Sequence, residues 1–332
     1  MSYKQLCDQA RQRMGEYCHA CYVCNGVACR GAVPGPGGIG SGQVPIKNFE
    51  GWQDIEIVMD TIGDTSDPDT SCTLFGQSFD LPVFVAPVGD IQRHYSDYLD
   101  TISYSRAVLR GARREGSCAF VGDGLDERIL QQETELIFAQ QGMGIPTIKP
   151  WDMETIFNKI EMVKRVHPVA IAMDIDAAGL PFLQGQTPPA GPKTVAQLKE
   201  IVQACGDIPF LLKGIMSEEG AYKAKEAKCY GIVVSNHGGR VLDGCPSTAS
   251  VLPKIKQAAG DDMKVLVDGG IRSGLDVYRA LQLGVDAALI ARPFVVAAFA
   301  NKYEGVAEYM AQIKAELKQT MLMCGKKDID SI

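Results

Sequence analysis

Short apolar runs alternate with longer segments of helical period along most of the chain after Pro82. Eight of these runs are rich in β-branched and other apolar residues. They cover residues 82–88, 117–122, 145–150, 168–176, 209–215, 230–236, 264–270 and 287–293. An apolar run that is continuous, without a polar residue at every second position, is typical of a strand buried on both faces, as in a parallel sheet.

The segments between these runs have the spacing of amphipathic helices, and several begin with a Ser, Thr or Asp that can cap free N–H groups. The clearest helical segments are residues 126–142, 152–167, 194–205, 217–229 and 273–284. Eight buried strands that alternate with helices predict a single (β/α)8 TIM barrel, because that fold consists of eight parallel strands, each followed by a helix. A doubly wound open sheet is the competing interpretation.

The first 50 residues follow a different pattern. They contain a group of cysteines and then the stretch GAVPGPGGIGSG at residues 31–42, which has too many Gly and Pro residues for a helix or a strand. We therefore expect residues 1–50 to form an irregular, Cys-rich segment packed on the barrel. The barrel itself is expected over residues 51–332.

The composition suits a soluble globular protein, since 46% of the 332 residues are hydrophobic and 22% are charged. The net charge of −7, with both signs interspersed, argues against nucleic acid and anionic membranes as partners. The chain contains no run of about 18 apolar residues, so no transmembrane helix is predicted. The polar N-terminus does not resemble a signal peptide, so we expect a cytoplasmic protein. We also expect its partner to be a small-molecule substrate.

The C-terminal ends of the predicted strands carry most of the candidate chemistry. These ends hold Pro87, Gly89, Lys149, Asp174, Asp176, Lys213, His237, Asp268 and Arg292. In a TIM barrel, the active site forms at this end of the strands. Four ionisable groups of opposite sign, Asp176, Lys213, His237 and Asp268, are then expected to converge at one mouth.

The last two strand ends have the residues of a phosphate site. Asp268-Gly269-Gly270 ends one strand and is followed by Arg272 and a helix, and the next strand ends in Ala291-Arg292. Glycines let backbone N–H groups approach an anion, and a helix N-terminus adds partial positive charge. A simple tight turn is the alternative, but the two arginines favour a phosphorylated cofactor.

The loop Ser235-Asn236-His237-Gly238-Gly239-Arg240-Val241-Leu242-Asp243 resembles the signature loop of the FMN-dependent α-hydroxy acid oxidases and dehydrogenases (glycolate oxidase- and lactate oxidase-like proteins). Other segments resemble that family in the same order. They are the first strand at 83–89, strand four at 170–179 with Asp176, strand five at 211–214 with Lys213, and the FMN phosphate segment at 268–293. The resemblance covers roughly residues 80–300.

This resemblance implies an enzyme that uses FMN to oxidise a 2-hydroxy acid, or a close analogue, to the 2-oxo acid. His237 would be the base, Asp176 would orient its imidazole, and Arg240 would clamp the substrate carboxylate. The implied FMN-binding residues are Pro87, Val88, Gly89, Lys213, Ser235, Asp268, Gly269, Gly270, Arg272, Ala291 and Arg292. The family resemblance also implies a homo-oligomer, a tetramer or larger.

Three features depart from the family pattern. Strand three ends in Ile148-Lys149-Pro150, where the family has a Gln-Leu-Tyr type of stretch, so Lys149 becomes a candidate substrate contact. The loop at 177–194 lacks a second arginine, and the cysteine segment replaces an N-terminal tyrosine. Two alternatives stay open. One is an FMN barrel with non-redox chemistry, like the type 2 isopentenyl diphosphate isomerases, and the other is a ligand-binding barrel without turnover.

Four of the eleven cysteines, Cys18, Cys21, Cys24 and Cys29, are spaced closely enough to converge on one metal centre. The spacing resembles the C-x2-C-x2-C-x3-C run of bacterial ferredoxins, with a last gap longer by one residue and no following proline. A structural zinc would also accept four thiolates, and reduced, partly buried thiols are the remaining alternative. An iron–sulfur cluster near a flavin would favour a dehydrogenase over an oxidase. The stretch at 34–42 is expected to be a loop over the barrel mouth or a second anion cradle.

Overall fold

The computed structural model describes residues 1–332 and contains a barrel of eight parallel strands. The strands follow one another around the barrel in the order β3-β10-β9-β8-β7-β6-β5-β4. They are β3 (Val83–Val85), β4 (Phe120–Val121), β5 (Ile145–Ile148), β6 (Ile171–Asp174), β7 (Phe210–Ile215), β8 (Gly231–Val234), β9 (Lys264–Val267) and β10 (Ala287–Ile290). A single bridge between Val85 and Ala119 joins the two ends of this order. Each strand lies within one of the eight apolar runs, and the predicted (β/α)8 fold is confirmed.

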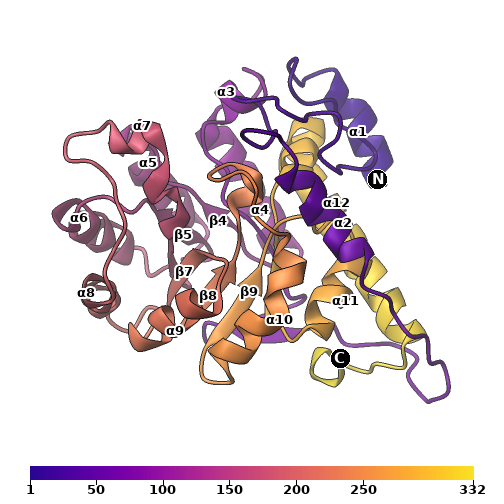
Figure 1. The fold of residues 1–332 in the computed structure, drawn as a ribbon. Coiled ribbons are helices and arrows are strands. Elements are labelled where there is room, and N and C mark those ends of the chain that lie inside the picture. Colours follow the sequence, from indigo (N-terminus) through magenta and orange to yellow (C-terminus); the bar gives the residue numbers. More distant parts are fainter.

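Helices alternate with the strands and surround them (Figure 1). They are α4 (Thr101–Arg114), α5 (Glu127–Ala139), α6 (Met153–Lys164), α8 (Val195–Cys205), α9 (Glu218–Glu226), α10 (Thr248–Ala259), α11 (Gly274–Gln282) and α12 (Arg292–Met323). The five helices expected from the sequence are all present, and a Ser, Thr or Asp side chain caps the N-terminus of each. The helix α12 is interrupted at Asn301 and Lys302, whose backbone is not helical.

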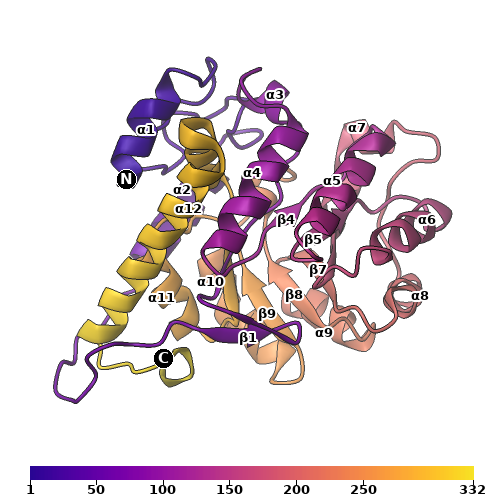
Figure 2. The ribbon, with the colours of Figure 1, turned by 180° about the vertical axis from the view of Figure 1, so that it is seen from behind.

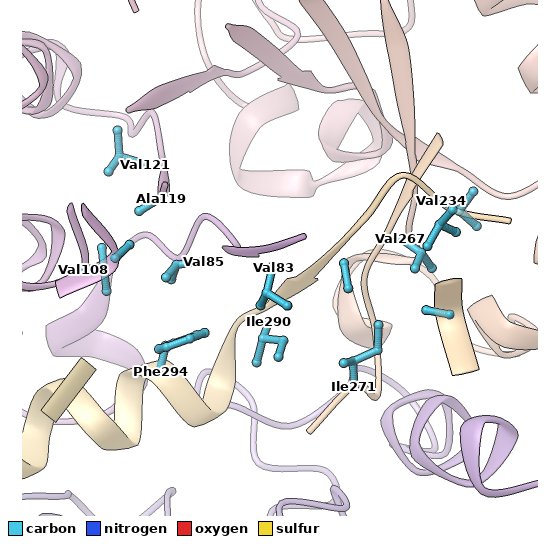
Figure 3. Packing of buried hydrophobic residues seen from close by; sticks show 14 of the residues in the cluster. Val83, Val85, Val108, Ala119, Val121, Val234, Val267, Ile271, Ile290 and Phe294 are labelled. Atoms are coloured by element: carbon cyan, nitrogen blue, oxygen red, sulfur yellow. The ribbon is translucent and has the colours of Figure 1, made fainter. Parts of the chain in front are cut away.

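Two layers of apolar side chains hold the barrel together, because successive strand residues face opposite sides. The barrel interior is filled by residues such as Phe84, Leu211 and Leu289. Their neighbours along the strands face the helices, and Figure 3 shows Val83, Val85 and Ile290 beside Phe294 of α12. The hairpin of β1 (Cys72–Leu74) and β2 (Gln77–Phe79) adds aromatic rings to the interior, since Phe79 lies edge-on to Phe84 at 4.9 Å.

The N-terminal segment contains two helices, α1 (Tyr3–Arg11) and α2 (Val44–Gln53). The expectation of irregular structure up to residue 50 is therefore corrected at both ends, because these stretches have enough apolar positions to pack on the barrel helices. Helix α1 lies along α12, and α2 lies against α10 and α11 (Figures 1 and 2). The residues between α1 and α2 form only turns and bends, and the GAVPGPGGIGSG stretch lies among them.

Short helical turns occupy several connections at the C-terminal ends of the strands. They are α3 (Ile91–His94), α7 (Pro181–Gln184) and two 3-10 turns at Ile175–Gly179 and His237–Gly239. A further 3-10 turn, Ile329–Ser331, lies near the C-terminus of the chain. No helix is both long enough and apolar enough to pass through a membrane.

Candidate active site

His237 and Asp176 form a hydrogen-bonded pair at the C-terminal end of the barrel. Each residue lies in a 3-10 turn directly after its strand, His237 after β8 and Asp176 after β6. The imidazole Nδ1 lies 3.1 Å from both carboxylate oxygens of Asp176. The His237 side chain is 22% exposed and that of Asp176 is 10% exposed. The pair is thus largely shielded from water, with the imidazole the more accessible of the two groups.

Lys213 lies within β7, beside β8, and is almost fully buried. Its Nζ donates to Ser235 Oγ at 3.0 Å and lies 3.4 Å from Asp268 Oδ2. Burial alone would lower the pKa of Lys213, but the carboxylates of Asp268 and Asp176 outweigh it and raise this pKa. Burial likewise opposes ionisation of Asp176, and the charges of His237 and Lys213 reverse the effect and lower its pKa. Both groups are therefore charged at neutral pH.

Lys149 lies at the end of β5 and is paired with a neighbouring strand end. Its ammonium contacts the carboxylate of Asp174, the last residue of the neighbouring strand β6. The Lys149 side chain is 16% exposed. Its backbone N–H donates to Asp123 Oδ2 at 3.2 Å. Asp123 also accepts from Lys159 Nζ at 2.8 Å and from Trp151 Nε1 at 2.6 Å, so it anchors this corner of the barrel.

Asp123 was not predicted from the sequence as a site residue. It follows β4 in the run Val121-Gly122-Asp123, and this position at a strand end was the available signal.

The side chains of Asp174, Asp176 and His237 bring three potential metal ligands within 4.8 Å of one another. The ammonium of Lys149 already contacts Asp174, so the charge of that carboxylate is already compensated.

The guanidinium groups of three arginines at the barrel mouth donate to backbone carbonyls, and none of them forms an ion pair with a carboxylate. Arg240 donates to the oxygens of Gly35 at 2.6 Å and Gly37 at 2.9 Å. Arg272 donates to Cys24 O, and Arg292 donates to Pro36 O and Gly238 O. Burial lowers the pKa of Arg240, and the nearby charge of Arg292 lowers it further. The three guanidinium groups thus form a positively charged cluster without a paired carboxylate. Such a cluster favours an anionic ligand.

The Gly- and Pro-rich stretch lies over the mouth, as one of its two interpretations predicted. Besides the contacts to Arg240, the N–H of Ile39 donates to Gly239 O at 2.9 Å. Ser41 binds the carboxylate of Asp243 through its N–H at 2.7 Å and its hydroxyl at 2.9 Å. The stretch is therefore fastened to the 237–243 loop at several points.

His94 is a second neighbour of Arg240 that sequence reasoning missed. Both of its ring nitrogens lie 3.4 Å from Arg240 Nη2, and its Nδ1 contacts Pro34 O. Burial lowers the pKa of His94, and the charge of Arg240 lowers it further, so the ring is neutral at pH 7. No local motif marks His94, because its partners lie 60 and 146 residues away in the sequence.

The Asp268-Gly269-Gly270 turn packs closely against α2. Both glycines have a left-handed backbone, with φ of 89° and 88°. A Cβ on Gly270 would overlap the carbonyl oxygen of Asn48, and Trp52 Nε1 donates to Gly269 O at 2.7 Å. The close approach of α2 is thus a sufficient reason for these glycines, in addition to the anion contact that the sequence suggested.

Several features of the strand ends fit a large polar cofactor. Buried polar atoms without a partner are found on Thr147, Asp174 and Asp268, which belong to or directly follow β5, β6 and β9. Pro87, Val88 and Gly89 follow β3 and are half-buried, and no atom lies within 4 Å of a Cβ built on Gly89. Ala291 and Arg292 follow the adjacent strand β10. Open space thus lies beside Gly89, and polar atoms at three other strand ends have no hydrogen-bond partner.

The predicted site residues are thus brought together at one end of the barrel. The pair His237–Asp176 lies with Lys213, Ser235 and Asp268 around β6 to β9. The three arginines lie on the side covered by the N-terminal segment. Cys18, Cys21, Cys24 and Cys29 line one cavity, which Arg292 also lines. All eleven cysteines are free thiols.

Comparison with known proteins identifies the family. The model of the FMN-dependent dehydrogenase family matches residues 36–181 and 176–332. An L-lactate dehydrogenase of Caulobacter vibrioides is 30% identical over 89% of this chain and 90% of its own length. A peroxisomal (S)-2-hydroxyacid oxidase of Arabidopsis thaliana is 43% identical, but that match covers 40% of this chain and 37% of the plant protein.

Among solved structures, a mandelate oxidase variant with 2-hydroxy-phenylacetamide has a TM-score of 0.79 and 25% identity, over 99% of this chain and 95% of that one. A second mandelate oxidase variant, described with a C4a-OH-FMN adduct, has a TM-score of 0.74 and 27% identity, over 89% of this chain and 91% of that one. The family match extends over most of the residues that build the barrel and its mouth, and the chain belongs to the FMN-dependent dehydrogenase family of enzymes.

Proposed function

We propose that this protein binds FMN and oxidises a 2-hydroxy acid, or a close analogue, to the 2-oxo acid. The observation that carries the proposal is the His237–Asp176 pair, which lies beside buried Lys213 at the mouth of a barrel of this family. The names of the relatives support the substrate class, since they act on lactate, hydroxymandelate and other 2-hydroxy acids.

The cofactor would be held by groups from several strand ends. Lys213, Ser235 and Asp268 would contact the ring system, and Arg272 and Arg292 with Gly269 and Gly270 would contact the phosphate. Pro87, Val88, Gly89 and Ala291 would border the ring from β3 and β10. When bound, FMN would accept the two electrons and the Cα hydrogen that the substrate loses.

His237 is proposed to take the proton of the substrate hydroxyl. Its Nδ1 is engaged by Asp176, so Nε2 is the nitrogen left to accept a proton. The carboxylate of Asp176 fixes the ring orientation and stabilises the imidazolium that forms. Because the pKa of Asp176 is lowered, this carboxylate stays ionised while His237 gains its proton.

Arg240 is proposed to bind the substrate carboxylate. Its Nη1 is held by Gly35 and Gly37, whereas the contacts of Nη2 to Pro34 O and His94 are long, at 3.4 Å each. A carboxylate at Nη2 would form a stronger, charge-assisted bond and would supply the missing counter-ion. We propose that Lys149, paired with Asp174, lines the same substrate site as a polar but nearly neutral unit.

The proposal is tested by loading the protein with FMN and adding 2-hydroxy acids without oxygen. We expect a yellow protein whose flavin absorbance bleaches with at least one member of a panel that varies in size and charge. A protein that stays colourless after reconstitution would contradict the cofactor assignment. A bound flavin that no 2-hydroxy acid reduces would contradict the reaction and favour the non-redox or binding alternatives.

A further inference from the structure

The four cysteines of the N-terminal segment converge on one cavity, although they are spread over twelve residues of irregular chain. Cys18, Cys21, Cys24 and Cys29 all line it, with Tyr95 and Arg292 on the barrel side. Burial raises the pKa of Cys18, Cys21 and Cys29, and the nearby Cys24 thiol raises it further. All four side chains are partly buried, and none is in a disulfide.

The backbone holds this arrangement in place. The carbonyl of Cys24 accepts a hydrogen bond from Arg272 Nε at 2.6 Å, which ties the segment to the end of β9. Gly37 packs so closely on the Cys29 carbonyl that a Cβ at this position would overlap it. Left-handed residues at Ala20 and Gly26 turn the chain between the cysteines. The segment is thus held against the barrel at Cys24 and against the 34–42 stretch at Cys29.

The sulfur atoms lie too far apart in this structure for one tetrahedral ion, and this spacing is compatible with the wider ligand set of a cluster. Four thiolates on one zinc ion would lie about 3.8 Å apart, given tetrahedral bonds of about 2.3 Å. No three of the cysteine sulfur atoms lie within 4.8 Å of one another. Only Asp174, Asp176 and His237 bring three potential ligands that close together. A cubane iron–sulfur cluster holds its thiolates farther apart, because each of them binds a different iron atom.

We propose that Cys18, Cys21, Cys24 and Cys29 bind a [4Fe–4S] cluster between the N-terminal segment and the barrel. The cluster and its four thiolates would carry negative charge, and the guanidinium groups of Arg272 and Arg292 lie beside Cys24 and Cys29 to compensate it. This site goes beyond the proposed oxidation chemistry, and none of the four cysteines contacts the His237–Asp176 pair. It shares Arg272 and Arg292 with the proposed phosphate site.

The test is metal analysis of the full-length protein after expression and purification without oxygen. We expect about four iron atoms and about four acid-labile sulfides per chain, and an electron paramagnetic resonance signal after reduction with dithionite. Flavin content is measured on the same sample, so loss of the cluster and loss of the flavin are distinguished. One zinc per chain without sulfide, or no metal, would overturn the proposal.

Two variants and a matched control locate the site. Cys24→Ala and Cys29→Ala are expected to lose most of the iron and sulfide and to keep their flavin. Cys72→Ala serves as the control, because Cys72 is also partly buried but lies in the β1–β2 hairpin. Iron that persists in both variants would contradict the ligand assignment. The metal content of the unaltered protein decides the matter even if a variant fails to fold.

Discussion

His237 adopts a left-handed backbone conformation, with φ of 55°, that residues with a Cβ rarely adopt. Two contacts hold it there: the side-chain bond to Asp176 and the donation of its N–H to Ser235 Oγ at 3.1 Å. Backbone strain of this kind costs about 1–3 kcal/mol and persists where the surrounding structure imposes it, often at functional sites. The strain therefore supports the assignment of this turn to the active site.

Asp176→Asn is expected to change how stability depends on pH. The pKa of Asp176 in the folded protein lies below its ordinary value of 3.8, so its ionised form stabilises the fold above about pH 4. This contribution disappears as the pH falls through the folded-state pKa. The free energy of unfolding of the unaltered protein should thus fall more steeply below pH 4 than that of the variant. Parallel curves from denaturant titrations at pH 3 to 6 would contradict this reasoning.

Arg240→Lys is expected to weaken binding of the substrate carboxylate and to leave FMN content unchanged. A lysine keeps the charge but loses the planar pair of donors. The loss of a charge-assisted hydrogen bond of about 1.5–3 kcal/mol predicts a fall in kcat/KM of roughly 10- to 150-fold, mainly through KM. Steady-state kinetics of the FMN-loaded variant provide the measurement. An unchanged KM would remove Arg240 from the substrate site and leave it as an anchor of the 34–42 stretch.

The contact between α2 and the Asp268-Gly269-Gly270 turn shows how an N-terminal element shapes the mouth. Asn48 of α2 exchanges two hydrogen bonds with Asn236, which directly precedes His237. It also packs against Gly270. The helix α2 thus supports two adjacent loops of the proposed FMN and substrate sites at once.

Gly270→Ala is expected to destabilise the protein by about 3 kcal/mol, because a Cβ there would overlap Asn48 O in addition to straining the backbone. Gly76→Ala is the matched control. Gly76 has a similar left-handed backbone, with φ of 71°, but a Cβ at this position would meet no atom within 4 Å. The control should cost about 1–2 kcal/mol. Equal losses in thermal unfolding experiments would show that the packing of α2 contributes little.

The sequence predicted the barrel well, because buried parallel strands leave continuous apolar runs that need no knowledge of the partners. The cap residues of five helices were also visible locally. The helices α1 and α2 were missed, since Gly, Pro and Cys dominate the segment that joins them. The sequence left two roles open for the 34–42 stretch, a loop over the mouth or a second anion cradle, because its partners are more than 200 residues away.

The candidate site was predicted in part, because several of its residues directly follow strands that the sequence pattern reveals. His237, Asp176 and Lys213 lie at strand ends, so the fold class alone places them at one mouth. The pairing of Lys149 with Asp174, and the carbonyl partners of Arg240, depend on side-chain directions that no local pattern encodes. The expected homo-oligomer, a tetramer or larger, and the cytoplasmic location stay predictions.

Anaerobic reduction of the bound flavin, compared between the unaltered protein and His237→Ala, tests the central claim most directly. We predict that the same 2-hydroxy acid bleaches the flavin of the variant about 10²- to 10⁴-fold more slowly, the usual contribution of a general base, at an unchanged flavin content. Reduction at the same rate in both proteins would contradict the assignment of His237 as the base.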